Sequence, residues 1–355
     1  MESIPDSQVP LQKSCNEPRF NLSSEVGLRL DIGEGRLRRI LRHMRWLREA
    51  LFLLFIPCCL HGQPPQSFHT LIFVSDTQAP TWVEKLYLRS NNNVLATERI
   101  FGAILGQENL SAVIHGGDIT AYGSSGTNWS TVLPFLDSLR ARSVPFIAAR
   151  GNHDYYLSAS EGMENFRRFV PSCPQDYSLH AYGPVAVILL NSNFGHLPDS
   201  TIAEQRRWYV ETLSRIDTER SIHFAITVTH HPPYTNSTLV SGSREVQDNF
   251  LDAFDHSTKS VVFISGHAHR FEHFRVNGKD FLVIGGGGGL FHDKESTPTE
   301  NDLYTGKDRG MFFHFVRCGV WNDSLSFEVI KILPVSGKTE VVHQFTILSP
   351  SVGRN

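Results

Sequence analysis

The chain has 355 residues, of which 40% are hydrophobic and 19% are charged, and its formal net charge is -3. This is the composition of a soluble globular protein, ample for one large domain or two small ones. The small net charge excludes a global basic field, so bulk electrostatics gives no support for nucleic-acid binding, and no nucleic-acid partner is expected.

The beginning of the chain differs from the rest. Residues 1–43 are polar, and an arginine-rich stretch leads through Met44 into an apolar run at residues 50–60. These eleven residues behind arginines match a signal-peptide core and are shorter than the roughly 20 that a membrane-spanning helix needs. We therefore predict a signal peptide at residues 44–62 that starts at Met44, a non-native or disordered extension before it, and a secreted or periplasmic mature protein.

Two alternatives for this apolar run stay open, a buried amphipathic helix and a lipoprotein anchor on Cys58. After a signal peptide is removed, only Cys173 and Cys318 remain of five cysteines. An even pair in an exported protein is compatible with a disulfide, and two free buried thiols are the alternative.

From residue 68 onward, short apolar segments alternate with longer amphipathic ones, as in βαβ architecture. The pattern shows no internal repeat, and we interpret residues 67–350 as one α/β catalytic domain. Helices are predicted at residues 83–107, 129–141, 201–216 and 244–254. Strands are predicted at residues 68–75, 111–115, 145–149, 185–190, 222–228 and 260–264.

After residue 269 the pattern changes to consecutive strands without a convincing helix. Segments 271–276 and 281–284 flank Asn277-Gly278, a residue pair suited to a tight hairpin. The run Gly285 to Gly289 lacks the lysine of a phosphate-binding P-loop, and a close-packed strand is the preferred interpretation. Further strands are predicted at residues 311–317, 325–332 and 339–347.

Polar side chains follow five of the predicted strands. In α/β sheets ligands bind beyond the carboxyl ends of the strands, so these clusters should converge on one crevice. Carboxylate, carboxamide and imidazole groups together suit two borderline metal ions. The clusters are Asp76 and Gln78, Gly117-Asp118, Gly151-Asn152-His153-Asp154, His230-His231, and His267 with His269.

This ordered series of motifs, above all Gly-Asn-His-Asp and Gly-His-Ala-His, resembles the calcineurin-like metallophosphoesterase superfamily from about residue 68 to at least residue 289. The resemblance implies an α/β fold, a four-layer αββα sandwich of two mixed β-sheets flanked by helices. It also implies a metal-dependent hydrolase of phosphoric esters, a phosphatase or phosphodiesterase. Its cofactors would be two divalent or trivalent transition-metal ions (Mn, Fe or Zn) that bridge a nucleophilic hydroxide.

The resemblance also assigns ligands. Asp118 would bridge the two ions. The first ion would be held by Asp76, Gln78 and His269, and the second by Asn152, His230 and His267. His230 is chosen over His231 because the family's ligand lies two residues before a proline. His231 and Asn152 would then contact the substrate phosphate, and a packed structural histidine is the alternative for His231.

Gln78 departs from the family's pattern, because most members place a histidine there. A glutamine oxygen is a weaker, neutral ligand, so the first metal site is predicted to be weak or exchangeable. Purple acid phosphatases instead use a tyrosine three residues after the bridging aspartate. Here Tyr122 lies four residues after Asp118, so that pattern does not transfer well.

His153 is the predicted general acid, or hydrogen-bond donor, for the leaving oxygen. Asp154 is predicted to orient the His153 imidazole and raise its basicity, and capping of a turn is the alternative. Other residues beside the clusters are candidates for a substrate pocket or further polar contacts, with simple packing as the alternative. They are Trp82, Tyr155, Tyr156, Phe291, His292 and Asp293.

The leading hypothesis is therefore an exported phosphoesterase that acts on a phosphate-ester small molecule or phosphorylated substrate. A non-catalytic binding scaffold of the same fold is the second hypothesis, favoured only by Gln78. A nuclease is the third, and it lacks an evident basic groove or stacking platform. The natural substrate, monoester or diester preference and oligomeric state stay open, and membrane contact is expected only through the export signal.

Overall fold

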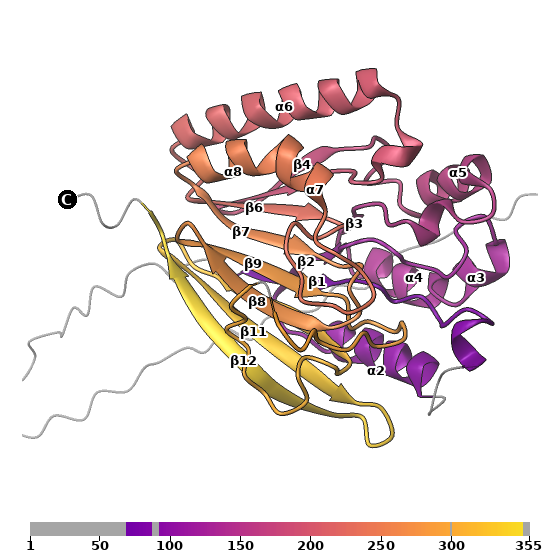
Figure 1. Cartoon of the computed structure of the whole chain (residues 1–355). Coiled ribbons are helices and arrows are strands. Elements are labelled where there is room, and N and C mark those ends of the chain that lie inside the picture. Colours follow the sequence, from indigo (N-terminus) through magenta and orange to yellow (C-terminus); the bar gives the residue numbers. More distant parts are fainter. Residues whose placement is uncertain (1–68, 87–91, 299, 351–355) are drawn as a thin grey trace, which may run out of the picture. The chain divides into compact units, whose positions relative to one another are not determined.

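The structure is a computed structural model that describes residues 69–86, 92–298 and 300–350 (Figure 1). The predicted signal peptide and the extension before it lie outside the described residues. Among the described helices, none is long and apolar enough to span a bilayer.

Two six-stranded mixed sheets form the framework. The first has the order β12-β11-β10-β1-β2-β3, in which β1, β2 and β3 are parallel and β10, β11 and β12 continue as an antiparallel meander. Its strands are β1 (His69–Val74), β2 (Leu110–His115), β3 (Phe146–Ala148), β10 (His314–Val320), β11 (Ser324–Leu333) and β12 (Lys338–Leu348).

The second sheet has the order β4-β5-β6-β7-β9-β8. Strands β5, β6, β7 and β9 are parallel to their neighbours in this order, whereas β4 and β8 pair antiparallel at the two edges. Its strands are β4 (Ser178–Tyr182), β5 (Val185–Leu189), β6 (Phe224–Thr229), β7 (Ser260–Ser265), β8 (Phe271–Val276) and β9 (Lys279–Ile284).

Helices cover the outer faces of the paired sheets. In Figure 1, α6 and α8 lie over the second sheet, and α2 lies on the opposite side of the molecule. The α-helices are α2 (Asn93–Leu105), α3 (Gly126–Ser130), α4 (Leu133–Ala141), α5 (Ala159–Phe169), α6 (Asp199–Thr218), α7 (Arg244–Val246) and α8 (Asp252–His256). Shorter turns are η1 (Glu84–Leu86), η2 (His153–Tyr155) and η3 (Phe194–His196), and a π-helical segment, η4 (Gln247–Leu251), joins α7 to α8.

Strand β5 shows how the core is divided. Successive side chains of a strand point to opposite faces of the sheet. Val185, Val187 and Leu189 belong to the core between the sheets. Ala186 and Ile188 belong instead to the core beneath α6 and α8. Because both faces of the strand are buried, its sequence is continuously apolar, and the predicted sandwich of two mixed sheets flanked by helices is confirmed.

Most predicted elements are present, and the predicted hairpin is confirmed. Strands β8 and β9 are antiparallel, and Asn277 and Gly278 both have positive φ angles (52° and 77°), as a tight hairpin turn requires. The long helix expected at residues 129–141 is instead two helices, α3 and α4, with Pro134 in the first turn of the second. A proline is accommodated there because its missing N–H would be unpaired in any case.

Further differences from the expectations follow. The glycine run, residues 285–289, is a loop and not a strand. The helix expected at residues 244–254 is interrupted by the π-helical segment, and β4 and α5 were not predicted at all. Cys173 and Cys318 are buried free thiols, so the disulfide alternative is wrong in this structure.

Candidate metal centre

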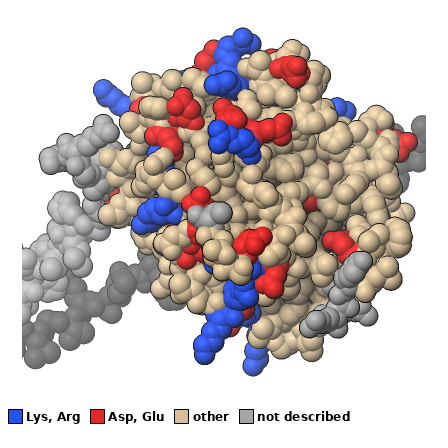
Figure 2. Space-filling model, in the orientation of Figure 1, with Lys and Arg blue, Asp and Glu red and all other residues tan. Residues whose placement is uncertain are grey.

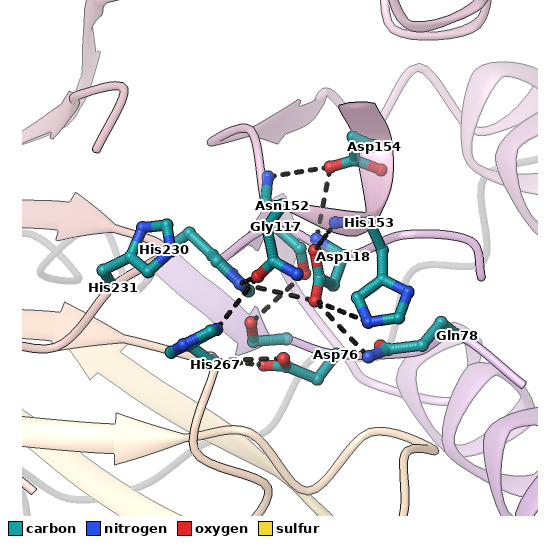
Figure 3. A network of polar contacts seen from close by, with 12 residues as sticks. Asp76, Gln78, Gly117, Asp118, Asn152, His153, Asp154, His230, His231 and His267 are labelled. Atoms are coloured by element: carbon teal, nitrogen blue, oxygen red, sulfur yellow. Dashed lines mark hydrogen bonds and ion pairs between the residues drawn. The ribbon is translucent and has the colours of Figure 1, made fainter. Parts of the chain in front are cut away.

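The polar residues predicted from the motifs meet at one edge of the sandwich (Figure 3). Asp76 follows β1, Asp118 lies just beyond β2, and Asn152 lies beyond β3. His230 follows β6, and His267 lies just beyond β7. Each of the five strands has a parallel neighbour, and β3 lies at the edge of the first sheet, so their carboxyl ends deliver side chains from both sheets to the same place.

The first group contains Asp76, Asp118 and His269, whose potential ligand atoms all lie within 4.8 Å of one another. The His269 Nε2 atom is 3.5 Å from Asp76 Oδ1. The other ring nitrogen, Nδ1, is 2.8 Å from the Leu290 carbonyl oxygen, which can only accept. Nδ1 therefore carries the proton, and the lone pair of a neutral imidazole is on Nε2, facing the carboxylates.

Gln78 completes this group when its amide is oriented to satisfy its hydrogen bonds. In that orientation the amide nitrogen donates to the carbonyl oxygens of Asp118 (3.0 Å) and Asp76 (3.1 Å). The side-chain oxygen then accepts from His269 Nε2 (3.2 Å), which requires this nitrogen to carry a proton in the metal-free protein. Gln78 thus turns its oxygen toward His269 Nε2, the nitrogen that would bind an ion if a cation replaced its proton.

The second group is built around Asn152. Its Oδ1 atom is 3.0 Å from His230 Nε2 and 2.9 Å from His267 Nδ1. His230 Nε2 is also 3.3 Å from Asp118 Oδ2, and the other nitrogen of this ring donates to the Gly116 carbonyl oxygen (3.0 Å). Asp118 therefore lies between the two groups, as a bridging ligand would (Figure 3).

Backbone strain is concentrated at these residues. Asp76, Asp118 and His267 have φ angles of 57°, 56° and 66°. Non-glycine residues rarely adopt positive φ, and such conformations cluster at functional sites, where the surrounding structure holds them. Each of these residues lies at the turn where the chain leaves its strand, so the left-handed conformation directs the side chain into the crevice.

The glycine run packs directly beneath the first group. Gly287 N donates to the Ser75 carbonyl oxygen (3.0 Å), and Gly289 N donates to that of Asp76 (3.3 Å). A Cβ atom at Gly287 would lie 2.2 Å from the Ser75 oxygen, and one at Gly289 would lie 2.3 Å from the His269 ring. These positions need glycine because backbone and ring approach closely, a contact that composition alone does not reveal.

The sequence model of calcineurin-like phosphoesterases matches residues 69–271, more than half of the chain. The chain belongs to the calcineurin-like phosphoesterase family. A search of curated proteins found no match.

Solved structures of low sequence identity share the phosphoesterase fold. GAP50 of Plasmodium, described as the anchor in the inner membrane complex, has a TM-score of 0.62 and 16% identity, covering 79% of this chain and 89% of that one. The purple acid phosphatase PPD1 from yellow lupin (Lupinus luteus) seeds has a TM-score of 0.56 and 17% identity, covering 80% of this chain and 54% of that one. At these identities the similarity shows the fold alone.

The electrostatics of this candidate centre fit bound cations. Burial alone would raise the pKa values of Asp76 and Asp118, but the neighbouring imidazoles lower both below the usual range of an aspartate. Burial likewise opposes protonation of His230 and His269, yet the carboxylates raise the pKa of His230 to about 9 and also raise that of His269. Two buried carboxylates thus hold protons on nearby imidazoles, and a bound cation would replace those protons.

His153 lies beside the bridging carboxylate. Its backbone N–H donates to Asp118 Oδ1 (2.8 Å), and its Nε2 atom is 4.0 Å from Asp118 Oδ2. Ring nitrogen Nδ1 is 2.9 Å from the Ala121 carbonyl oxygen, to which it donates. This bond fixes the ring so that Nε2 faces the centre, where it can exchange a proton with a substrate.

The predicted contact between Asp154 and the His153 imidazole is wrong. The Asp154 carboxylate instead accepts hydrogen bonds from the backbone N–H groups of Gly151 (2.8 Å), Asp118 (3.2 Å) and Ile119 (3.3 Å). Burial, together with the Asp118 charge, raises the pKa of Asp154 to about 7. Asp154 therefore links the loop after β2 to the loop after β3 by hydrogen bonds. This role is closer to the turn-capping alternative.

His231 faces the second group but is held by a residue that the sequence did not single out. The Ser192 hydroxyl accepts from the His231 backbone N–H (3.0 Å) and lies 2.9 Å from Nδ1 of its ring. The ring of His231 is 4.5 Å from that of His267, and burial together with the charge of His230 lowers its pKa to about 3. His231 is therefore a neutral imidazole in the crevice.

The aromatic candidates divide into residues packed against another ring and exposed residues. Tyr155 stacks on His196 with ring centroids 4.4 Å apart, and Phe291 packs 4.6 Å from Phe313. Trp82 and Tyr156 are exposed.

The polar candidates also divide. His292 stacks on the His269 ring at 4.4 Å and its Nδ1 atom accepts from the His269 backbone N–H (3.3 Å), so it supports a candidate ligand. Asp293 instead forms an exposed ion pair with Arg309 (3.5 Å).

Charges on the described surface are mixed. In the view of Figure 2, basic and acidic side chains are interspersed, and the described residues of this face form no continuous basic surface. The absence of a nucleic-acid partner stays a prediction.

Proposed function

We propose that the chain is an exported, metal-dependent phosphoesterase that hydrolyses phosphate esters with two transition-metal ions (Mn, Fe or Zn) bound at the candidate centre. One observation carries the proposal. The buried carboxylates of Asp76 and Asp118 face the imidazoles of His230 and His269, whose Nδ1–H groups are already used by backbone carbonyl oxygens. Such a set of inward-facing lone pairs is suited to cations.

Each proposed ion has a set of ligands of mixed oxygen and nitrogen type. Asp118 would bridge the two ions. Asp76, Gln78 and His269 would complete the first set, and Asn152, His230 and His267 would complete the second. Bound ions of this kind neutralise charge on phosphoryl oxygens and lower the pKa of water, so that a nucleophile is available near neutral pH.

His153 supplies the proton for the leaving group in this proposal. Its Nδ1–H bond to the Ala121 carbonyl oxygen leaves Nε2 facing the bridging carboxylate. A protonated Nε2 would donate to the leaving oxygen, a step that contributes most for esters of weakly acidic alcohols.

The partly exposed members of the centre define where the substrate enters. Asn152, His153, His231 and His267 are partly exposed, whereas Asp76, Asp118 and His230 are buried. The Asn152 amide and the His231 ring therefore face the side from which a phosphate group would approach, and we assign them to phosphate binding.

The decisive experiment measures metal and turnover on the same sample. The full chain, purified without chelator, is analysed for metal and assayed with an aryl phosphate monoester and a bis-aryl diester. We expect about two transition-metal ions per chain and hydrolysis of one ester class. Absence of bound metal together with absence of metal-stimulated hydrolysis would refute the proposal.

Two variants and a matched control separate metal binding by Asp118 from proton donation by His153. Asp118→Asn should lose both metal and turnover. His153→Ala should keep the metal and lose roughly 10²- to 10⁴-fold in rate on a substrate with a poor leaving group. His256→Ala, which changes an exposed histidine on α8, should change neither quantity.

A non-catalytic scaffold is the alternative function, and Gln78 is the feature that favours it. A scaffold would bind metal weakly or not at all and would hydrolyse neither ester, so the same measurement distinguishes it. Stoichiometric metal without hydrolysis of either probe also counts against the enzyme proposal as stated.

Export is the part of the proposal that rests on residues 44–62. Its support is the short apolar run behind arginines. N-terminal sequencing of the native protein should find a mature chain that begins near residue 63. A chain that begins at Glu2 or Ser3 would contradict it.

A further inference from the structure

Leu157 lies two residues beyond η2, the turn that begins with His153, and it combines two unfavourable properties. Its φ angle is 68°, and the residue is 80% exposed. A bulky residue seldom has positive φ because its Cβ atom crowds the following carbonyl oxygen, whereas glycine or asparagine adopts this conformation more easily. An exposed leucine also gains little from burial. The isolated protein therefore offers no reason for a leucine at this position.

Leu157 stands apart from the other residues with this conformation. The described chain contains eight non-glycine residues with positive φ, and three of them are the candidate ligands Asp76, Asp118 and His267. Leu157 is the apolar member of the eight. The remaining four are Asn109, Ser143, Asn277 and Arg309.

The strained conformation is imposed by the residues on either side. The Tyr156 carbonyl oxygen accepts a hydrogen bond from Ser124 Oγ (3.1 Å), and the Tyr156 N–H donates to the His153 carbonyl oxygen (3.2 Å). Ser158 caps the N-terminus of α5 through its side chain. Leu157 must connect a fixed residue to a helix cap, which leaves its backbone no freedom to relax.

The turn beneath is equally constrained. The carbonyl oxygen of Asp154 lies against Gly123 and Gly162, and a Cβ atom on either glycine would be 2.1 Å from it. The segment is therefore held in place by close packing as well as by hydrogen bonds, and its exposed side chains are presented in a fixed position.

That position is beside the proposed proton donor. The Tyr156 ring packs edge-on against the His153 ring with centroids 4.6 Å apart, and Tyr122 packs against Tyr156 at 6.4 Å. Tyr156 is 47% exposed. An exposed aromatic ring thus adjoins the histidine that would protonate the leaving oxygen, and the exposed leucine is the next residue of the chain.

We propose that Tyr156 and Leu157, here called the Tyr156–Leu157 rim, bind an apolar leaving group. The inference rests on the proposed function and specifies its substrate class as phosphate esters of apolar alcohols, alkyl or aromatic, in preference to small or highly polar ones. Strain at Leu157 is retained because the side chain contacts the substrate, and this contact exists only in the complex.

The rim is tested by comparing ethyl, hexyl and benzyl esters of the class, monoester or diester, that the enzyme hydrolyses. These leaving groups have similar basicity and differ mainly in apolar size. Wild-type protein should prefer the hexyl or benzyl ester by kcat/KM, and comparison of those two distinguishes an alkyl from an aromatic leaving group. Leu157→Asn should reduce the preference over ethyl by about tenfold.

The same variant should change stability in the opposite direction. Asparagine adopts positive φ more readily than leucine, so Leu157→Asn should raise Tm by about 2 °C while it lowers selectivity. Leu157→Met, which keeps an apolar side chain, should retain the preference. Ser143→Asn is the matched control, since Ser143 is exposed with φ 55° at the end of α4, and it should leave selectivity unchanged.

Binding of non-hydrolysable ethyl-, hexyl- and benzylphosphonate to the metal-loaded protein, measured by calorimetry, separates the two proposals. A hexyl or benzyl preference without any turnover would support the rim and refute the enzyme. Turnover with equal affinity for all three phosphonates would support the enzyme and overturn the rim. A Leu157→Asn variant that keeps the wild-type preference would also overturn it.

Discussion

At the scale of single residues, Gln78 decides how firmly the first metal ion would be held. Its oxygen faces His269 Nε2 at 3.2 Å only because its amide nitrogen is bonded to two backbone carbonyl oxygens. An amide oxygen is a weaker ligand for borderline metals than an imidazole. The chain thus supplies a well-oriented but weak donor at this position.

Gln78→His should therefore strengthen the first site. We expect slower loss of the first metal ion during dialysis against a chelator, with the second ion unaffected. Elemental analysis at successive times measures this. Equal loss from wild type and variant would show that residue 78 is not a ligand.

Substitution of Asp154 tests whether this residue stabilises the fold or orients the catalytic candidate His153. Its buried carboxylate accepts three backbone N–H groups, and an asparagine would turn an NH₂ group toward donors. Asp154→Asn should lower the free energy of unfolding by about 2 kcal/mol, measured by urea denaturation. Asp137→Asn, at an exposed ion pair, should lower it by less than about 1 kcal/mol. Lower turnover with unchanged stability would restore the orienting role.

At the scale of elements, the sequence predicted the strands and turns that a local residue pattern specifies. Buried parallel strands such as β5 and β7 are apolar runs, and Asp118 and His267 follow strands at glycine-containing turns, so strand and ligand positions could be predicted together. Asn277-Gly278 likewise specifies its own turn.

The predictions that were wrong concern residues whose roles depend on contacts between segments distant in the sequence. The glycine run was interpreted as a strand because nothing within it shows that Gly287 packs on Ser75. Asp154 was assigned to its neighbour His153, yet its partners include Asp118 and Ile119, more than thirty residues away. Ser192, which holds His231, carries no motif at all.

Alanine in place of glycine should destabilise the glycine loop and stabilise helix α2. Gly287→Ala places a Cβ atom 2.2 Å from a backbone oxygen, which should lower the free energy of unfolding by about 1–3 kcal/mol and weaken metal binding. Gly102→Ala, in α2, meets nothing within 4 Å and should raise stability by about 0.5–1 kcal/mol. Urea denaturation compares both, and a tolerated alanine at 287 would contradict the close packing.

At the scale of the whole molecule, the two sheets meet at a buried histidine. His314 begins β10 of the first sheet, its N–H donates to Gly286 (3.0 Å), and its ring lies 5.5 Å from that of Phe271 on β8 of the second sheet. Nδ1 donates to the Phe312 carbonyl oxygen (2.9 Å), whereas Nε2 is buried without a hydrogen-bond partner among the described residues. A second proton on this ring would therefore have no acceptor.

Acid should destabilise the assembled sandwich through this ring. Burial lowers the pKa of His314 from 6.5 to about 4, although the Phe312 carbonyl and the carboxylates of Asp76 and Asp308 act in the opposite direction. Between these pH values the unfolded chain binds a proton that the folded protein does not, so stability is complete above pH 6.5 and falls as the pH drops toward 4.

His314→Asn keeps a donor near Nδ1 and removes the titration. Between pH 6.5 and pH 4 the free energy of unfolding should fall by up to about 3 kcal/mol less in the variant than in the wild type. Both proteins are unfolded with urea in the presence of chelator. The chelator removes metal release as a second source of pH dependence. Because the contribution is taken as the difference between two proteins, other acidic groups cancel. Parallel stability curves for wild type and variant would mean that the proton reaches His314 equally in both states and that the contact between the sheets is more open than the structure shows.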